Sequence, residues 1–172
     1  DPPPPGSVAV HGRTSLMFQE SALFPWLSVR GNINLALRLA GVPKGERHDR
    51  ASELLHMVRL KGMGGKRPHE LSGGMRQRVA LARALAQNAS VLLMDEPFGA
   101  LDAITRDLLH DELERVWQET GLSVVFVTHN VREAVRLGDR VLVLSSRPGR
   151  VVDEIRVHIP RPPPLPVTEV AS

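Results

Sequence analysis

Apolar residues follow two different patterns along this sequence. Between residues 25 and 88 they recur every three or four positions, the spacing that places side chains on one face of an α-helix. The pattern predicts helices over about 29–40, 46–60 and 74–86, so that the whole segment is helical. Ser28 stands directly before the first of these helices and is a candidate N-cap, since a serine side chain can accept a hydrogen bond from the first turn.

Unbroken apolar runs replace this periodicity after the helical segment. VLLMD (91–95), SVVFVT (123–128) and RVLVLS (140–145) are typical of strands that are buried on both faces of a parallel sheet. Helical patterns over about 103–120 and 131–138 separate the three runs. The alternation of strand and helix predicts a doubly wound α/β core.

Shorter stretches extend this core towards both termini. Residues 8–18 end in SLMF and predict a strand that stops at Gln19, whereas SSRPGRVVDEI predicts a turn into a short peripheral strand. Proline clusters, DPPPPG and IPRPPPLP, predict extended terminal segments. We therefore divide the chain into a remnant of core strands, a helical insertion, the C-terminal part of the core and a proline-rich tail, with the bounds 1–24, 25–88, 89–158 and 159–172.

Composition narrows the range of partners. The 172 residues are 42% hydrophobic and 24% charged, which is enough for one globular domain with a core. A net charge of +3 is a weak indication of anionic partners, and no basic run interleaved with aromatic residues indicates nucleic acid. The lack of cysteine excludes disulfides and thiolate metal ligands and fits a reducing cytosol. No apolar run approaches the about 20 residues of a membrane span.

Two adjacent acids, Asp95 and Glu96, end the apolar run VLLMD and precede Pro97. Ligands of open α/β sheets lie at the carboxyl ends of the strands, so a carboxylate at this position can hold a hydrated Mg²⁺. The next carboxylate points to the other side of the strand and can orient or deprotonate a water molecule. The alternative interpretation is a strand followed by a solvated turn, and the acid pair alone does not decide between the two.

The stretch HELSGGMRQRVALARALA places a serine and two glycines before a predicted helix. Because Gly73 and Gly74 have no Cβ, backbone N–H groups can approach an anion there, and the helix dipole favours negative charge. Ser72 can offer its hydroxyl to the same anion, or it is only the N-cap of the helix. Arg76 and Arg78 lie in the first turns, where the dipole disfavours cations, so we expect some of these charges to meet acids or phosphate.

Two single residues at predicted strand ends complete the candidate set. Gln19 follows the first strand, where its amide can touch a metal-bound water. His129 follows VVFVT, where an imidazole can reach a terminal phosphate. Either residue alone is more often a local hydrogen-bonding group, and we assign no role to the other six of the seven histidines.

Taken in their order along the chain, LSGGMRQR, VLLMDEP, GALD and VTHN resemble the nucleotide-binding subunit of an ATP-binding cassette (ABC) transporter. The resemblance covers the chain from about residue 8 to 160. It implies a P-loop NTPase (RecA-like) core with a parallel sheet and an inserted ABC α-helical subdomain. The N-terminal part of that core is expected to be missing.

The resemblance also implies a role for each candidate residue. Asp95 resembles the Walker B aspartate that holds Mg²⁺, Glu96 the catalytic glutamate and His129 the catalytic switch histidine. Gln19 resembles the Q-loop glutamine, which is associated with both the metal and the catalytic centre. The predicted nucleotide-binding residues are the signature loop and the D-loop aspartate, namely Ser72, Gly73, Gly74 and Asp102.

Further stretches are similar to one branch of importers. MFQESALFPWLSVRGNI, MDEPFGALDAITR and SSRPGRVVDEI resemble ATPases of nitrate, sulfonate and taurine uptake systems. This implies ATP and Mg²⁺ as cofactors, a homodimer of nucleotide-binding subunits and, as partners, integral-membrane permease subunits. A periplasmic or lipoprotein substrate-binding protein would take part indirectly, and nucleic acid is not expected. The implied location is peripheral, on the cytoplasmic face of the plasma (inner) membrane.

Local features add two expectations. Leu23, Phe24 and Trp26 follow Gln19 and are expected to form an apolar groove for a cytoplasmic permease helix, unless they are ordinary loop packing. Asn130 stands where many relatives have aspartate, and we expect little consequence from this difference.

One motif of P-loop ATPases is not found in this sequence. G-x-x-x-x-G-K-[ST] cradles phosphates with its backbone while its lysine neutralises them. The nearest stretch, LKGMGGKRP, has Leu60 in place of the first glycine and Arg67 in place of Ser or Thr. Because the family's loop lies upstream of the Q-loop, we expect an N-terminally truncated chain that does not hydrolyse ATP by itself.

Two other functions remain open at this point. One is a non-transport ABC ATPase that acts on nucleic acid, although such proteins usually carry longer insertions than residues 25–88. The other is a non-catalytic fragment that pairs with a complete subunit and presents its signature loop to the partner's nucleotide.

Overall fold

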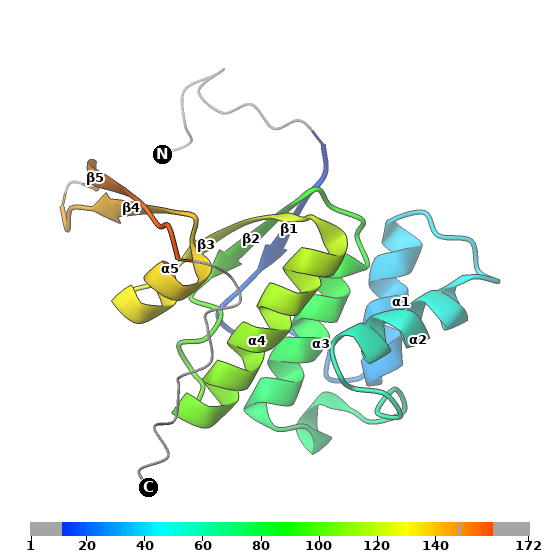
Figure 1. Ribbon diagram of the computed structural model, residues 1–172. Coiled ribbons are helices and arrows are strands. Elements are labelled where there is room, and N and C mark those ends of the chain that lie inside the picture. The colour runs from blue at the N-terminus through cyan, green and yellow to red at the C-terminus, as the bar shows by residue number, and fades with distance from the viewer. Residues whose placement is uncertain (1–11, 148, 160–172) are drawn as a thin grey trace, which may run out of the picture. The chain divides into compact units, whose positions relative to one another are not determined.

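The computed structural model describes residues 12–147 and 149–159, which fold as two compact units that divide between Val127 and Thr128. The first unit contains a parallel sheet with helices α1 to α4, and the second contains helix α5 and two further strands (Figure 1). Residues 8–11 of the first predicted strand and nearly all of both proline clusters lie outside the described residues. The predicted subdomain bounds at residues 24, 88 and 158 stay a prediction.

The sheet of the first unit has three parallel strands in the order β1-β2-β3. All three strands were predicted, and the structure sets their bounds at Thr14–Met17, Val91–Asp95 and Ser123–Val127. Because the strands are parallel, the residues that follow them emerge at the same edge of the sheet. The strand ends that carry candidate residues therefore meet at one edge.

Only one face of this sheet is buried. Side chains alternate along each strand, and Met17 and Met94 on one face are buried. On the other face Leu16 is 47% exposed, and Val125 and Val127 are each 56% exposed. We name these three residues the open sheet face. The prediction that the apolar runs are buried on both faces is wrong for this chain. An apolar run indicates that a strand can be buried, but it does not show whether another layer covers each face.

The third apolar run forms β4 (Arg140–Leu144), but this strand does not join the parallel sheet. It pairs antiparallel with β5 (Val151–Arg156) in the second unit. The connection covers only residues 145–150, which suits a hairpin and is too short for a parallel crossover. The N–H of Ser145 donates to the Arg150 carbonyl at 2.9 Å and closes this turn. The peripheral strand is confirmed, whereas the parallel pairing expected for residues 140–145 is wrong.

The segment 25–88 is helical, as predicted. It contains helices α1, α2 and α3 and the short 3₁₀ turn η1, with the bounds Val29–Leu39, Arg47–Met57, Gly73–Leu85 and Pro68–Glu70. Ser28 caps α1, because its hydroxyl oxygen accepts the Gly31 N–H at 3.0 Å. Among the described helices, none is both long and apolar enough to cross a membrane.

Helix α3 occupies the centre of the first unit. It packs against α1 and α2, against strand β1, and against α4 (Ala103–Thr120) (Figure 1). The stripe predicted for α4 is buried at Leu109, Leu113 and Val116, whereas Trp117 is only half-buried. Movement of α3 would therefore displace the sheet, the other helices and the loops between them.

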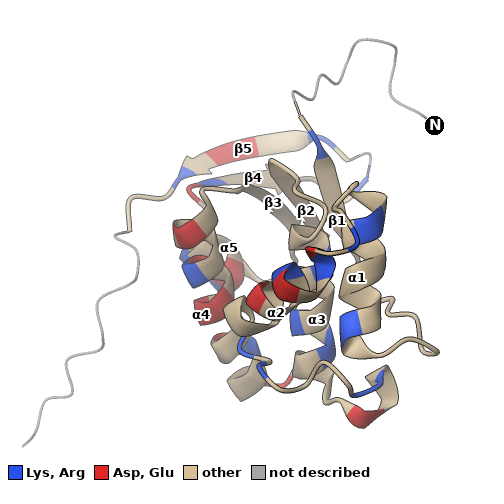
Figure 2. Cartoon of the chain, turned by 90° about the vertical axis from the view of Figure 1, so that its right-hand side faces the viewer, with Lys and Arg blue, Asp and Glu red and all other residues tan. Residues whose placement is uncertain are grey.

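Charge is distributed unevenly over these helices. Residues 25–88 carry twelve Lys or Arg and only four Asp or Glu, so Lys and Arg predominate on α1 and α3, whereas α4 carries several acids (Figure 2). Several of the guanidinium groups donate to backbone carbonyls: Arg47 to Val42 at 2.7 Å and Arg83 to Ala22 at 2.6 Å. Three of the twelve positive side chains, those of Arg47, Arg76 and Arg83, thus hold backbone segments in place.

A buried acid joins α4 to the residues after α2. The Glu112 carboxylate, 1% exposed, lies 3.0 Å from Arg59 Nε and 2.5 Å from Arg115 Nη2. A carboxylate so deeply buried requires cationic or hydrogen-bonding partners, and here two arginines supply them. Arg59 reaches the carboxylate from a residue with a φ of +54°, just after α2 ends. This ion pair therefore attaches the helical segment to α4, although Arg59 and Glu112 are far apart in the sequence.

Candidate functional site

Strand β2 ends in two carboxylates that differ in backbone conformation. Asp95 is the last residue of the strand and is exposed. Glu96 is half-buried and has a φ of +42°, in the left-handed region that is unfavourable for residues with a Cβ. Its N–H donates to the Val127 carbonyl at 2.9 Å, so a hydrogen bond to the end of β3 supports this turn. Strain of this kind is often found at functional sites.

The side chain of Gln19 reaches Glu96 from across the sheet edge. Gln19 lies two residues beyond β1, and its Nε2 is 3.5 Å from Glu96 Oε2, although 77 residues separate the two in sequence. Gly99 leaves room for both groups, since a Cβ there would lie 3.3 Å from Gln19 Nε2 and 3.4 Å from Glu96 Oε2. The structure therefore brings Gln19 and the acid pair together and adds Gly99, which the motif analysis missed.

The donor set at this edge fits a magnesium ion bound together with phosphates. Mg²⁺ in such sites usually takes one or two carboxylates and completes its octahedron with water and phosphate oxygens. Asp95 offers one exposed carboxylate at the strand end. Within the described part of the chain, no group of three or more His, Asp or Glu side chains gathers as a metal cage. Metal binding by Asp95 stays a prediction.

The signature stretch forms the first turn of α3. Ser72 is exposed and caps the helix, with its hydroxyl oxygen accepting the Met75 N–H at 3.3 Å. At Gly73 an added Cβ would make only an ordinary contact, 3.6 Å from Leu101 Cδ2. At Gly74 it would lie 2.2 Å from Thr105 Cγ2, so a larger residue would force the Thr105 side chain of α4 to move. Anion binding by the loop stays a prediction, but packing against α4 is a second reason for a glycine at position 74.

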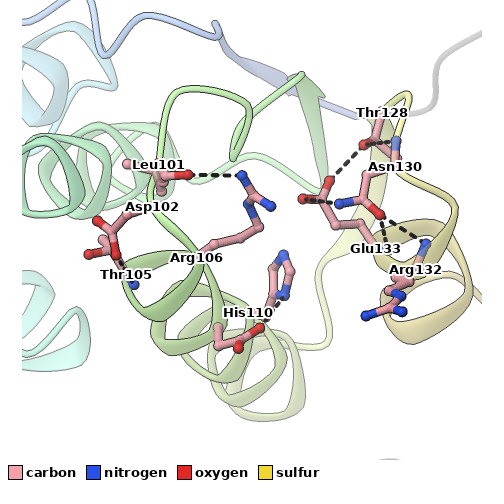
Figure 3. Close-up of polar contacts among 10 residues, drawn as sticks. Leu101, Asp102, Thr105, Arg106, His110, Thr128, Asn130, Arg132 and Glu133 are labelled. Atoms are coloured by element: carbon pink, nitrogen blue, oxygen red, sulfur yellow. Dashed lines mark hydrogen bonds and ion pairs between the residues drawn. The ribbon is translucent and has the colours of Figure 1, made fainter.

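Helices α3 and α4 begin with the same local arrangement. In α3, Arg76 donates to the Leu71 carbonyl at 2.7 Å. In α4, Arg106 donates to the Leu101 carbonyl at 2.8 Å, as Figure 3 shows. In each case the guanidinium reaches back to the residue before the N-cap and neutralises an otherwise free carbonyl. For Arg76 the structure shows a backbone oxygen as partner, and the expectation that some of these charges meet acids or phosphate stays a prediction.

Asp102 is the N-cap of α4. Its Oδ1 accepts the Thr105 N–H at 3.0 Å (Figure 3). This hydrogen bond stabilises the ionised carboxylate and lowers the pKa of Asp102 below its ordinary value. The carboxylate stays charged over a wide pH range and faces the positive end of the helix dipole. The cap shows how the position is held, whereas a contact with nucleotide stays a prediction.

His129 is exposed and lies between β3 and α5 (Val131–Leu137), in the second unit. Its two sequence neighbours are anchored to one buried acid: Thr128 Oγ1 donates to Glu133 Oε2 at 2.6 Å, and Asn130 Nδ2 donates to Glu133 Oε1 at 3.3 Å (Figure 3). Asn130 also caps α5, accepting the Arg132 N–H at 3.0 Å. The structure thus gives Asn130 a role in holding the histidine turn, which we did not expect from sequence.

The aromatic loop after Gln19 is held from both sides. The buried Asn32 side chain accepts the Phe24 N–H at 2.8 Å and donates to its carbonyl at 3.2 Å. The Phe24 ring lies 5.5 Å from that of Trp26 and 5.9 Å from the Arg83 guanidinium. Trp26 is nevertheless 66% exposed. The loop is fixed while its tryptophan faces solvent, and a permease groove stays a prediction.

The family profile described as ABC transporter matches residues 5–99. The chain belongs to the ABC transporter family. It is 54% identical over 137 residues to the taurine import ATP-binding protein TauB of Rhizobium johnstonii. The aligned region covers 80% of this chain and 52% of that protein. It is 45% identical over 168 residues to the nitrate import ATP-binding protein NrtD of Synechocystis, which covers 93% of this chain and 63% of that protein.

Solved ABC structures confirm the fold class. The ATP-binding cassette MJ0796, as a dimer in a post-hydrolysis state bound to ADP and Pi, superposes with a TM-score of 0.70 at 36% identity and covers 84% of this chain and 63% of that one. Another dimeric structure of the same cassette gives a TM-score of 0.70 at 37% identity, over 83% and 62% of the two chains. This ABC chain therefore has the P-loop NTPase core with helical insertion, and it spans between half and two thirds of the length of these relatives.

Proposed function

We propose that the protein is the ATP-hydrolysing subunit of an ABC importer for small molecules of the nitrate, sulfonate or taurine type. The observation that supports this most is the meeting of Gln19 and Glu96, 77 residues apart, at the carboxyl edge of the sheet. A strained, half-buried acid with an amide beside it is suited to binding and orienting a water molecule. The similarity to taurine and nitrate import subunits supports the substrate class.

In this proposal each of the four candidate residues Asp95, Glu96, Gln19 and His129 has its own role. Asp95 would hold Mg²⁺, which when bound neutralises charge on the β- and γ-phosphates. Glu96 would orient the attacking water by accepting a hydrogen bond from it, while its backbone N–H is held by the Val127 carbonyl. The Gln19 amide, at 3.5 Å, restrains the Glu96 carboxylate without adding a charge. His129 would stabilise charge on the terminal phosphate.

The signature loop would serve the nucleotide of a second subunit. Ser72, Gly73 and Gly74 begin a helix of 13 residues, whose free N–H groups suit a phosphate. Asp102, at the start of α4, would act in the same interface. The dimeric state of the similar cassettes supports a homodimer, and we propose that its subunits are arranged head to tail. ATP would then close two half-sites at once, and closure would drive the permease from the cytoplasmic face of the membrane.

We further propose that a polypeptide limited to these 172 residues does not turn over ATP. Its sequence contains no G-x-x-x-x-G-K-[ST], and the phosphates need that loop for their cradle. Hydrolysis would belong to a protein that carries this chain together with such a loop. The prediction is checked by measuring phosphate release from both polypeptides. Turnover by the 172 residues alone, abolished by Glu96→Gln, would contradict it.

The role of Glu96 is tested in the loop-carrying protein. Glu96→Gln keeps the shape of the side chain but removes the charge that orients water, so hydrolysis should fall by about 10²–10⁴-fold, the usual contribution of a general base. ATP binding should persist, and an ATP-bound dimer should accumulate on size-exclusion chromatography. Glu53→Gln, on the exposed surface of α2, is the control. Hydrolysis by the Glu96 variant at the parental rate would show that the acid has another role.

A further inference from the structure

Gln77 is a polar residue on the buried face of α3. It is 4% exposed and shares that face with Gly74, Leu81 and Ala84, all of which are buried. Helical periodicity favours an apolar residue at such a position. Burial of an amide costs free energy unless its groups find hydrogen-bond partners. A glutamine kept at this place needs an explanation from its contacts.

The Gln77 amide holds two loops at the same time. Its Nε2 donates to the Gln19 carbonyl at 2.7 Å and to the Pro97 carbonyl at 3.0 Å. An NH₂ group has two hydrogens, so each loop receives one. Because both partners are carbonyl oxygens, only the NH₂ end of the amide can face them, which fixes its orientation.

These two carbonyls flank the reacting pair. The first belongs to Gln19 itself, whose side chain lies 3.5 Å from Glu96, and the second belongs to the residue directly after Glu96. One side chain of α3 therefore holds the backbone on both sides of the Gln19–Glu96 contact. The same helix starts at the signature loop, five residues earlier, with Ser72 as its cap.

Arg83 adds a second attachment between α3 and the loop after Gln19. Its guanidinium donates to the Ser21 carbonyl at 3.1 Å and to the Ala22 carbonyl at 2.6 Å. Burial lowers the pKa of Arg83. Ala22 has a φ of +44°, so this loop is held in a conformation that it would not favour alone. Gln77 and Arg83 therefore attach this loop to α3 at two places along the helix.

The arrangement has a cost that packing alone does not explain. Gln77 Oε1 is buried and finds no hydrogen-bond partner among the described residues. A leucine or methionine would fill similar space without an orphan oxygen, but it would release both carbonyls. The glutamine is therefore suited to connecting the loops and less suited to filling the core.

We propose that Gln77 is a positioning residue that couples the signature helix to the Gln19–Glu96 pair. When the Ser72–Gly74 loop engages a nucleotide and α3 shifts, the amide carries the Gln19 and Pro97 backbones with it. Contact at the signature loop is thereby reported to the hydrolytic acid inside the same chain. The inference rests on the proposed function, because it assigns a regulation to that site.

The first test needs no enzymatic activity. Gln77→Met keeps the length of the side chain and removes both donors, and Gln118→Met, on the exposed surface of α4, is the matched control. Hydrogen exchange in the 172-residue chain should become about tenfold faster in residues 18–24 and 96–101, as expected for the loss of one ordinary hydrogen bond per loop. Exchange in α1 and α2 should be unchanged. Parental exchange in both loops would overturn the proposal.

The second test separates positioning from packing. In the loop-carrying protein, Gln77→Met should lower kcat about tenfold and leave the KM for ATP within about twofold, because the acid is misplaced while the phosphate cradle is intact. An unchanged kcat would show that Gln77 only supports the core. If the unsubstituted protein does not hydrolyse ATP, the proposed function and its coupling both fail. The exchange result still decides whether Gln77 holds the two loops.

Discussion

At the scale of single residues, one missing methyl group sets the distance between α3 and α4. A Cβ on Gly74 would lie 2.2 Å from Thr105 Cγ2, whereas one on the neighbouring Gly73 would lie 3.6 Å from Leu101 Cδ2. Gly74→Ala should therefore lower the free energy of unfolding by about 1–3 kcal/mol through overpacking. Gly73→Ala should have little effect on stability. Urea denaturation of the two variants checks the difference.

A compensating change makes this prediction sharper. Thr105→Ser removes the methyl group that the new Cβ would meet. The pair Gly74→Ala and Thr105→Ser should therefore regain most of the stability lost by Gly74→Ala alone. Equal destabilisation with and without Thr105→Ser would mean that the cost comes from the helix start and not from the contact with α4.

Residue-level chemistry was only partly accessible from the sequence. The acid pair and Gln19 stand at strand ends, so their convergence followed from the parallel sheet, and the structure brings Gln19 to 3.5 Å from Glu96. Gln77 was missed because a lone glutamine in a helix usually faces solvent, and its two acceptors lie 58 and 20 residues away. The close approach at Gly74 was missed for the same reason: it depends on which helix packs there.

At the scale of elements, the start of α5 depends on one side chain. Asn130 Oδ1 accepts the N–H groups of Arg132 and Glu133 at 3.0 and 3.4 Å. Asn130→Ala should cost about 1 kcal/mol of stability, a typical value for a lost N-cap. Asn130→Ser keeps an acceptor oxygen for the cap without placing a second carboxylate beside Glu133, and it should cost less. Amide exchange in residues 131–134 checks both variants, and equal loss in the two would contradict the capping role.

The loop after Gln19 can be tested as an element of its own. Its backbone is held by Asn32 and Arg83, while Trp26 is 66% exposed. Trp26→Ala should therefore weaken co-purification with a permease more than it weakens ATP binding in the loop-carrying protein. Leu39→Ala, at the opposite end of α1 and 78% exposed, is the control. Equal loss of both kinds of binding would indicate a folding defect instead of a docking surface.

Element boundaries were largely predictable, whereas element pairing was not. Caps and glycines mark helix ends locally: Ser28 caps α1, and Gly121, with a φ of +63°, ends α4. Strand partners depend on distant segments, so β4 was assigned to the parallel sheet although it pairs antiparallel with β5. Burial on both faces was assumed for the apolar runs because hydrophobicity does not reveal what covers a strand.

At the scale of the whole molecule, the open sheet face should govern how the 172-residue polypeptide behaves in solution. Exposed apolar side chains at Leu16, Val125 and Val127 should bind a hydrophobic dye such as ANS. Val125→Thr should reduce dye binding and change the free energy of unfolding by less than about 0.5 kcal/mol, as for most surface substitutions. Val124→Thr, on the other face and half-buried, should cost more, about 1 kcal/mol, because its hydroxyl loses part of its contact with water.

Dye fluorescence and urea denaturation of the two valine variants check this contrast. Unchanged dye binding in Val125→Thr would place the dye elsewhere on the molecule. A large loss of stability in Val125→Thr would show that this face is covered in solution, for example by another copy of the chain.

Because of the left-handed backbone at Glu96, selection for stability and selection for function should favour different residues at this position. A glycine would adopt a φ of +42° without steric conflict, so the position favours glycine for folding, whereas the proposed function needs a glutamate there. A library selected only for heat resistance should therefore enrich Glu96→Gly, a change that would remove the acid on which the proposed function depends. Retention of an acid at this codon across natural variants would be a measure of selection for turnover over robustness.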